Sequence, residues 1–195
     1  MSTIQLPPAD PRLQLLLDKD ELRELTFMYA QRLVTGDCRG IASLFTEDGV
    51  LDYADVLRLA RPTDATERQW SAGSDLVFTG RAAIHEFVPS ICELQVKAFF
   101  TNHIFRVTGD TALGVSFYEN RILQRGASVM GAGRMFDEFR RVNGRWLISY
   151  RRQVLFYFTG IHEGWAREMD RAFPQPIIDK RGWESALLAG WGSEP

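Results

Sequence analysis

The sequence RMFDEFRRVNGRWLISYRR, residues 134–152, places two strand-like runs on either side of an Asn-Gly dipeptide. Asn143-Gly144 is a strong signal for the two-residue turn that joins antiparallel strands. Each run continues outward, so we expect strands over 129–142 and 145–158. This part of the chain therefore predicts a long β-hairpin.

Two more strands are expected before this hairpin. The runs 99–107 and 111–124 are separated by Thr108-Gly109-Asp110, and Arg125-Gly126 follows the second run. Four strands with such short connections form an antiparallel meander. Glycines within and between these strands weaken a flat sheet but suit one that bends sharply around helices. The glycines concerned are Gly114, Gly126, Gly131 and Gly133.

The longest predicted helix precedes the meander. Asp18 and Glu21 form a capping-box pattern, so we expect a helix over 19–35 that begins after Asp18. Gly36 can take the left-handed conformation at its C-terminal end. Apolar residues recur along it at three- and four-residue spacing and so share one face. These residues are Leu22, Leu25, Tyr29 and Leu33.

Shorter elements are expected between this helix and the meander. The apolar residues of 41–45 indicate a short second helix, and an Asp48-Gly49 turn leads to a lone strand over 50–54. A third helix is predicted from Arg81 to about Val96, kinked or split at Pro89 because proline removes a backbone donor. The order of elements indicates an α+β fold.

The chain has room for one domain with a sizeable core, because it has 195 residues and 45% hydrophobic content. We expect an N-terminal arm at 1–17 and a domain at 18–160. The polar segment 55–75 is expected to be a loop or lid. The tail at 161–195 carries three tryptophans and is expected to pack on the pocket mouth or on a neighbouring subunit.

Charge and composition exclude several classes of protein. A net charge of −2 and a pI near 6.0, without long basic runs, predict no nucleic-acid partner. No stretch has the length and apolarity of a membrane span or a signal peptide. Cys38 and Cys92 have neither metal-ligand spacing nor the density of a disulfide framework, which fits a cytoplasmic protein. We expect no metal, no cofactor and a small-molecule partner.

Five segments, in this order and spacing, resemble the SnoaL-like branch of the nuclear transport factor 2-like superfamily over roughly residues 18–160. They are LVTGD, ASLFTEDG, TGRAAI, TNH and FRRVNGRW. The resemblance implies an NTF2-like cone in which a curved, mixed or antiparallel sheet wraps around three N-terminal helices and a deep central pocket. Related members include scytalone dehydratase, polyketide cyclases, a dehydrochlorinase and lyases of lignin-derived diaryl compounds. Others are noncatalytic binding domains, so the fold does not decide the activity.

The resemblance assigns His103 the position of the catalytic base of the dehydratase and dehydrochlorinase members. Judged without the resemblance, a lone histidine in a strand is more often a structural residue with an ordinary hydrogen bond than a catalytic base. The usual aspartate partner corresponds to Val34, counting three residues back from Asp37. Val34 cannot orient the imidazole, and we expect it to contact substrate instead. Asp37 is expected to cap the turn between the first two helices.

Two tyrosines and an arginine are further candidates. Tyr29 is either a pocket residue or a core tyrosine with a bonded hydroxyl. By resemblance, Tyr53 in LDY matches a substrate-binding tyrosine, and Arg151, five residues after Trp146, matches a pocket arginine. A buried arginine needs a negative partner. Arg151 is therefore either a clamp for a substrate oxyanion or half of a buried ion pair.

Strand alternation divides the remaining candidates between two faces. Matching Gly114 to the family places Ser116, Tyr118 and Asn120 on the inner face, where they would contact substrate. Met135 shares this interior with Gly133 and adds adaptable apolar surface. The outer face is apolar enough to suggest a homodimer or homotrimer interface. Its residues are expected to be Phe117, Phe136, Ile148 and Tyr150.

These residues support two hypotheses. The first is a cofactor-independent lyase or isomerase that moves a proton on an aromatic, polycyclic or polyketide-like molecule. His103, Tyr53 and Arg151 would be catalytic, and the reaction would be dehydration, C–C cleavage such as diaryl deformylation, isomerisation or cyclisation. The second is a noncatalytic ligand-binding or assembly domain, such as an aromatic-ring oxygenase small subunit.

Overall fold

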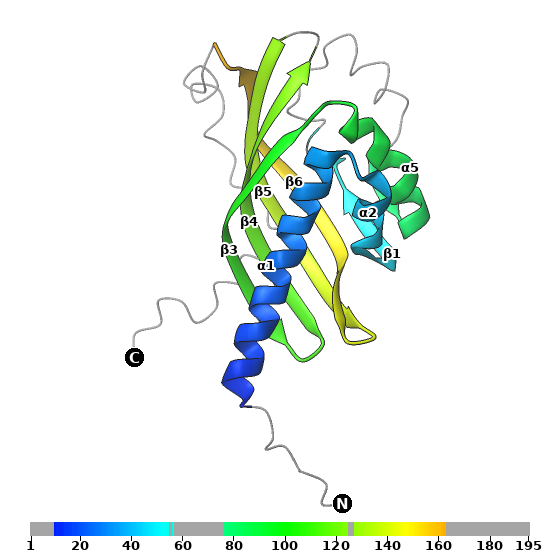
Figure 1. Ribbon diagram of the computed structural model, residues 1–195, viewed down its shortest axis with the longest axis vertical. Helices are drawn as coiled ribbons and strands as arrows, with labels where there is room; N and C mark the ends of the chain where they lie inside the picture. The colour runs from blue at the N-terminus through cyan, green and yellow to red at the C-terminus, as the bar shows by residue number, and fades with distance from the viewer. Residues whose placement is uncertain (1–9, 55, 57–75, 125–126, 163–195) are drawn as a thin grey trace, which may run out of the picture.

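The computed structural model describes residues 10–54, 56, 76–124 and 127–162 (Figure 1). Most of the predicted loop at 55–75 and nearly all of the predicted tail at 161–195 lie outside these residues. The described part is an α+β fold in which helices pack against one curved, open sheet. Within it, no helix is long and apolar enough to cross a membrane.

The sheet has six strands in the order β2-β1-β6-β5-β4-β3. Strand β1 runs parallel to β6, and all other neighbours are antiparallel. The predicted meander is therefore confirmed as β3 to β6. The strands are β1 (Phe45–Asp52), β2 (Val77–Thr79), β3 (Lys97–Thr108), β4 (Thr111–Gln124), β5 (Ala127–Val142) and β6 (Arg145–Gly160).

The predicted hairpin turn is confirmed between β5 and β6. Asn143 and Gly144 have φ values of 51° and 75°. Positive φ at both central residues is the property of a type I′ turn, whose twist matches that of the flanking strands. The register Val142↔Arg145 follows directly from this two-residue turn.

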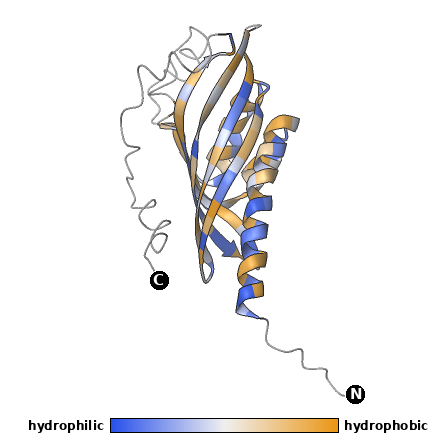
Figure 2. Ribbon diagram, turned by 90° about the vertical axis from the view of Figure 1, so that its left-hand side faces the viewer, coloured by the Kyte–Doolittle hydropathy of each residue, from blue (hydrophilic) through white to orange (hydrophobic). Residues whose placement is uncertain are grey.

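Three helices are described: α1 (Pro11–Thr35), α2 (Cys38–Ser43) and α5 (Arg81–Cys92). Figure 2 shows that α1 lies along one face of the sheet, which we call the inner face. Gly36 ends α1 with φ of 73°, and the Asp37 side chain accepts a hydrogen bond from the backbone N–H of Gly40 at the start of α2. Both interhelix predictions are confirmed.

The predicted start of the first helix at residue 19 was wrong, because α1 begins at Pro11 inside the expected N-terminal arm. Asp10 is the N-cap and accepts a hydrogen bond from the Arg12 N–H at 2.9 Å. Proline is well suited to the first helical position, where its missing N–H is not needed. Asp18 is instead a buried residue inside the helix and forms an ion pair with Arg141.

The predicted turn at Asp48-Gly49 was also wrong. Both residues lie within β1, which begins at Phe45 and not at Val50. The pairing with β6 is irregular between Phe45 and Val50, and a side chain on Gly49 would come within 3.0 Å of the Phe45 Cβ. Gly49 therefore allows a close backbone approach inside an irregular strand, which local sequence does not distinguish from a turn.

The third helix ends at Cys92, before the predicted Val96, and it is neither split nor ended at Pro89. The backbone N–H of Glu93 still donates to the Pro89 carbonyl at 3.0 Å. Pro89 lies in the last turn, so only one helical hydrogen bond is lost. The short strand β2, just before α5, was not predicted from the sequence.

A β-bulge changes the predicted faces of β6. The pairing of β5 with β6 shifts between Glu138 and Phe139, so the alternation of side chains is interrupted there. Ile148, predicted on the outer face, is fully buried in the main core against the helices. Phe136 and Tyr150 belong to a second, smaller cluster on the outer face, as expected. The predicted homo-oligomer stays a prediction.

Candidate active site

The inner face of the meander carries a row of buried polar and apolar side chains. Met135 on β5 lies opposite Ser116 on β4 and opposite Gln153 on β6. All three are at least 95% buried. The Ser116 hydroxyl has no hydrogen-bond partner among the described residues. Ser116 and Met135 therefore lie inward, as the strand alternation predicts.

Arg151 forms a buried ion pair in the next row of this face. Its Nε donates to Asp137 Oδ1 at 2.7 Å and its Nη2 donates to Oδ2 at 2.8 Å, and both side chains are essentially unexposed. Of the two sequence-based alternatives, the ion pair is present. The third guanidinium nitrogen, Nη1, is buried and has no partner among the described residues.

The guanidinium of Arg151 also lies over two aromatic rings, one on α1 and one on β3. Its central carbon is 4.2 Å from the ring centroid of Tyr29 and 5.8 Å from that of Phe100. Burial alone would lower the pKa of Arg151, but the charge of Asp137 and its hydrogen bonds raise the pKa overall. The arginine therefore keeps its positive charge inside the core.

Tyr29 and Tyr53 meet beside this cation. Their hydroxyl oxygens are 3.3 Å apart, and both side chains are buried. Burial raises the pKa of both phenols, although the charge of Arg151 partly opposes the rise for Tyr29. Both groups are therefore neutral near pH 7. Of the two protons in this pair, one can bridge the hydroxyls and the other remains available to an acceptor.

Tyr118 lies on the same face, but its hydroxyl is already used. It donates to the backbone carbonyl of Val154 at 3.3 Å, and burial raises the pKa of the phenol. The hydroxyl occupies the space above Gly133, where a Cβ would lie 2.6 Å from it. Farther along β4, Asn120 is partly buried and its Oδ1 has no partner among the described residues.

His103 lies against α1 at Thr26, three residues before Tyr29. Its Nε2 is 3.0 Å from Thr26 Oγ1, and that hydroxyl donates to the Arg23 carbonyl at 2.8 Å. Thr26 has one hydroxyl proton, so it accepts from Nε2–H when that proton goes to the Arg23 carbonyl and donates to Nε2 when it does not. We assign the first arrangement, in which the imidazole proton is on Nε2 and the lone pair is on Nδ1. The charges of Asp137 and Arg151 act on the imidazole, but no hydrogen bond among the described residues joins it to Tyr29 or Arg151.

An irregularity in β3 sets the direction of His103. The pairing with β4 shifts between Thr101 and Ile104, and Asn102 has φ of 53°. Bulges re-aim side chains in this way. The imidazole consequently packs edge-on against Phe27 of α1 at 5.2 Å and stacks on Phe105 at 5.8 Å.

The free energy of unfolding is expected to depend on the protonation of His103. The pKa of His103 lies below its usual 6.5, and burial is the largest cause of this shift. The unfolded chain then binds a proton more readily than the folded protein between these two values. Stability is therefore fully present above pH 6.5 and decreases as pH falls toward the folded pKa. Denaturant unfolding at several pH values should show this decrease.

His103→Gln is the matched variant for this measurement, because it keeps a donor for Thr26 but does not titrate. Its stability should change less than that of the wild type over the same pH range. A His103 pKa of 6.5 or higher, measured by NMR, would contradict the expectation.

Sequence reasoning missed two residues of this region, Asp137 and Thr26. Asp137 is two residues beyond Met135, so the same alternation places it on the inner face. Thr26 lies four residues after Leu22 and three before Tyr29, on the predicted core face of the helix. Val34 is half-buried near the end of α1, and no described contact joins it to Tyr29, Tyr53 or His103.

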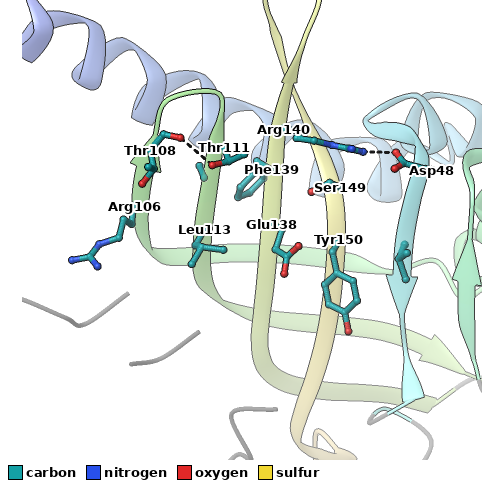
Figure 3. Close-up of a pocket in the computed structure, with 12 residues that line it drawn as sticks. Asp48, Arg106, Thr108, Thr111, Leu113, Glu138, Phe139, Arg140, Ser149 and Tyr150 are labelled. Carbon is teal, nitrogen blue, oxygen red and sulfur yellow. Dashed lines mark hydrogen bonds and ion pairs between the residues drawn. The ribbon is translucent and has the colours of Figure 1, made fainter. Parts of the chain in front are cut away.

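A groove of about 670 Å³ lies on the outer face of the sheet and is separate from these residues. Figure 3 shows Arg106, Leu113, Glu138 and Tyr150 directed to the same side, while Arg140 pairs with Asp48 at one end. Within the described residues, no group of three or more potential ligands could hold a metal ion. We take the inner face as the candidate active site because Tyr29, Tyr53 and Arg151 meet there.

The chain belongs to the SnoaL-like domain family, whose sequence profile matches residues 14–152. No curated protein matches the chain. Solved structures show the same fold, including an NTF2-like protein with a cystatin-like fold from Novosphingobium aromaticivorans. It is 25% identical, with a TM-score of 0.56 over 74% of this chain and 85% of its own.

Two further similar structures have names that refer to enzymes. One, provisionally named a scytalone dehydratase, also comes from Novosphingobium aromaticivorans; it is 19% identical, with a TM-score of 0.60, and covers 74% of this chain and 87% of its own. The other is a hexachlorocyclohexane dehydrochlorinase that is 15% identical, with a TM-score of 0.61 and coverage of 77% and 93%. At these identities the likeness concerns the fold.

Proposed function

We propose that the protein is a cofactor-independent lyase or isomerase that moves a proton on an aromatic or polyketide-like small molecule. The observation that carries the proposal is the buried Tyr29–Tyr53 hydroxyl pair beside the guanidinium of Arg151. Neutral phenols and an unused cationic N–H are donors suited to a carbonyl or phenolic oxygen. Unsatisfied buried donors are rare in folded proteins and call for an explanation such as a ligand.

The charge balance of this cluster favours a particular kind of oxygen. Asp137 neutralises Arg151, so the cluster as a whole has little net charge. A preformed carboxylate would gain little from such a site after its own desolvation. An oxygen that becomes negative only during the reaction would be stabilised by donors that are already in place. The arrangement therefore suits an enolate or phenolate intermediate.

His103 is the proposed proton carrier. In the tautomer assigned to His103, the lone pair is on Nδ1, and the lowered pKa keeps the imidazole neutral near pH 7. A neutral imidazole can accept a proton from carbon or oxygen and return it at another position. Dehydration, C–C cleavage, isomerisation and cyclisation share this proton transfer and an oxygen-centred intermediate.

Tyr53→Phe is expected to lower kcat about 100-fold, because a donor to the developing oxyanion is lost. Turnover should be measured by mass spectrometry with aromatic diols, hydroxyketones, polyketide fragments and steroid enones. His103→Ala should lose turnover but retain binding in a thermal-shift assay. Tyr150→Phe is the matched control, because Tyr150 lies on the outer face and donates to Asp52 at 2.6 Å.

Equal losses in Tyr53→Phe and Tyr150→Phe would contradict the assigned role of Tyr53. Turnover that survives in His103→Ala would contradict the assigned proton carrier. Ligand binding by the wild type without any product would contradict an enzymatic function for those compounds.

A noncatalytic ligand-binding or assembly domain is the second candidate. It is favoured by the bidentate Arg151–Asp137 pair, because this contact satisfies most of the cation without any ligand. Such a domain is expected to aggregate when purified alone and to become stable with a partner chain. An enzyme of this fold is expected to purify alone as a homo-oligomer.

A further inference from the structure

The two cysteines of the chain lie in contact although 54 positions separate them. Cys38 is the first residue of α2 and Cys92 is the last residue of α5. Their sulfur atoms are 2.9 Å apart. Both are free thiols and partly exposed. The fold thus creates a dithiol that the spacing of the cysteines does not predict.

The backbone around Cys38 is held in place by several contacts. The Asp37 carboxylate accepts a hydrogen bond from the Gly40 N–H at 2.9 Å, and Arg32 donates to Ser43 Oγ at 3.0 Å and to the Gly40 carbonyl. Cys92 is fixed from the other side, because α5 buries Ile91 and Val88 in the core. The short distance between the thiols is therefore a product of two anchored elements.

We propose that Cys38 and Cys92 form a reversible intramolecular disulfide that links α2 to α5. A disulfide bond is about 2.05 Å long, so the sulfurs would approach by about 0.9 Å from their present separation. Side-chain rotation and small backbone shifts provide such a movement. This modification is independent of the function proposed above.

Hydrogen peroxide is the oxidant in the proposed reaction. Burial, assisted by the hydrogen bond with Cys38, raises the pKa of Cys92 to about 12, so Cys92 stays a thiol. Cys38 attacks one oxygen of the peroxide and its sulfur is oxidised to a sulfenic acid, while its thiol proton passes to the other oxygen, which leaves as water. The Cys92 sulfur then attacks the sulfenic sulfur, and the thiol proton of Cys92 passes to the departing hydroxyl, which leaves as a second water. In total, two thiols and one peroxide give one disulfide and two waters.

The disulfide would restrain the helix that covers Tyr53. On α5, the ring of Phe87 packs against Tyr53 at 5.5 Å and stacks on Phe78 of β2 at 3.8 Å. A covalent bond from the end of this helix to α2 would limit its movement away from the sheet. Oxidation would therefore stiffen the helical side of the inner face.

The test begins with the reduced wild-type protein treated with a small excess of hydrogen peroxide. The expected product is a monomer about 2 Da lighter, in which neither cysteine is alkylated until a dithiol reductant is added. Proteolysis without reductant should give one linked peptide containing Cys38 and Cys92. Thiols that both remain alkylatable, or Cys38 found as sulfinic acid without the linked peptide, would overturn the proposal.

Single serine variants assign the roles of the two sulfurs. In Cys92→Ser, a trapping reagent for sulfenic acids should label Cys38. In Cys38→Ser, Cys92 should remain a thiol under the same treatment. Labelling of Cys92 in preference to Cys38 would overturn the assigned order of attack.

Thermal unfolding tests the link between α2 and α5. The disulfide closes a loop of more than 50 residues. The Tm of the oxidised wild type should therefore be higher than that of the reduced protein by about 10 °C. The same treatment should not raise the Tm of either serine variant. An oxidised wild type with the linked peptide but with an unchanged Tm would overturn the proposed restraint.

Discussion

Asp137→Asn is expected to lower the free energy of unfolding by about 3–5 kcal/mol. The substitution keeps the shape of the side chain but removes the only charge that compensates Arg151 in its described surroundings. Arg151 has no exposed surface, so water cannot replace the lost carboxylate. Urea unfolding followed by circular dichroism would measure the change.

Asp48→Asn is the matched control for this substitution. Asp48 forms an ion pair with Arg140, but both side chains are substantially exposed. Exposed pairs are worth at most about 1 kcal/mol, so this variant should stay close to the wild type. The double variant Asp137→Leu/Arg151→Met removes both charges and should recover much of the stability lost in Asp137→Asn. Equal effects of Asp137→Asn and Asp48→Asn would refute the assigned role of the buried pair.

Gly133→Ala is expected to cost about 3 kcal/mol, because the inner face has no room for a methyl group there. A Cβ at this position would lie 2.0 Å from the Val154 carbonyl oxygen and 2.6 Å from the Tyr118 hydroxyl. The first contact is with backbone, so β5 and β6 would have to separate locally. Urea unfolding would give the free energy, and hydrogen exchange would show faster opening of the β5–β6 ladder.

Gly109→Ala separates steric crowding from the general effect of replacing a glycine. Gly109 has φ of 58° and no atom within 4 Å of a new Cβ, so the substitution introduces only backbone strain of about 1 kcal/mol. A cost for Gly133→Ala no greater than that for Gly109→Ala would show that the strands accommodate the methyl group.

The meander could be predicted closely from the sequence because its turns are specified locally. Asn143-Gly144 fixes both the turn type and the register of the strands that follow it. The start of α1 was missed because the sequence offers two N-cap candidates, Asp10 and Asp18. Asp10 is the N-cap, whereas Asp18 forms an ion pair with the distant Arg141. A capping pattern does not reveal whether its carboxylate is used by the helix or by another strand.

The faces of the strands could be predicted only between bulges. Ser116, Tyr118 and Met135 lie inward as the alternation indicates. Ile148 does not follow it, because the β5–β6 pairing shifts next to it. The placement of His103 depends on a similar shift in β3. A bulge is a property of two paired strands, so one strand read alone does not show it.

The candidate site could be predicted in its residue types but not in its contacts. The need of a buried arginine for a negative partner follows from Arg151 itself. The meeting of Tyr29 from α1 with Tyr53 after β1 depends on how distant elements pack. The contact between Cys38 and Cys92 has the same origin, since it requires α2 and α5 to be in place.

The parallel pairing of β1 with β6 has a consequence for the order in which the protein is built. Phe45 lies opposite Ile148, about a hundred residues later in the chain, whereas every pair within the meander is joined by a short turn. Closing so long a loop costs conformational entropy, which is offset only when other contacts form. During synthesis, β1 leaves the ribosome long before its central partner exists. Strand β1 is therefore made early but can complete its pairing in the sheet only after β6 exists.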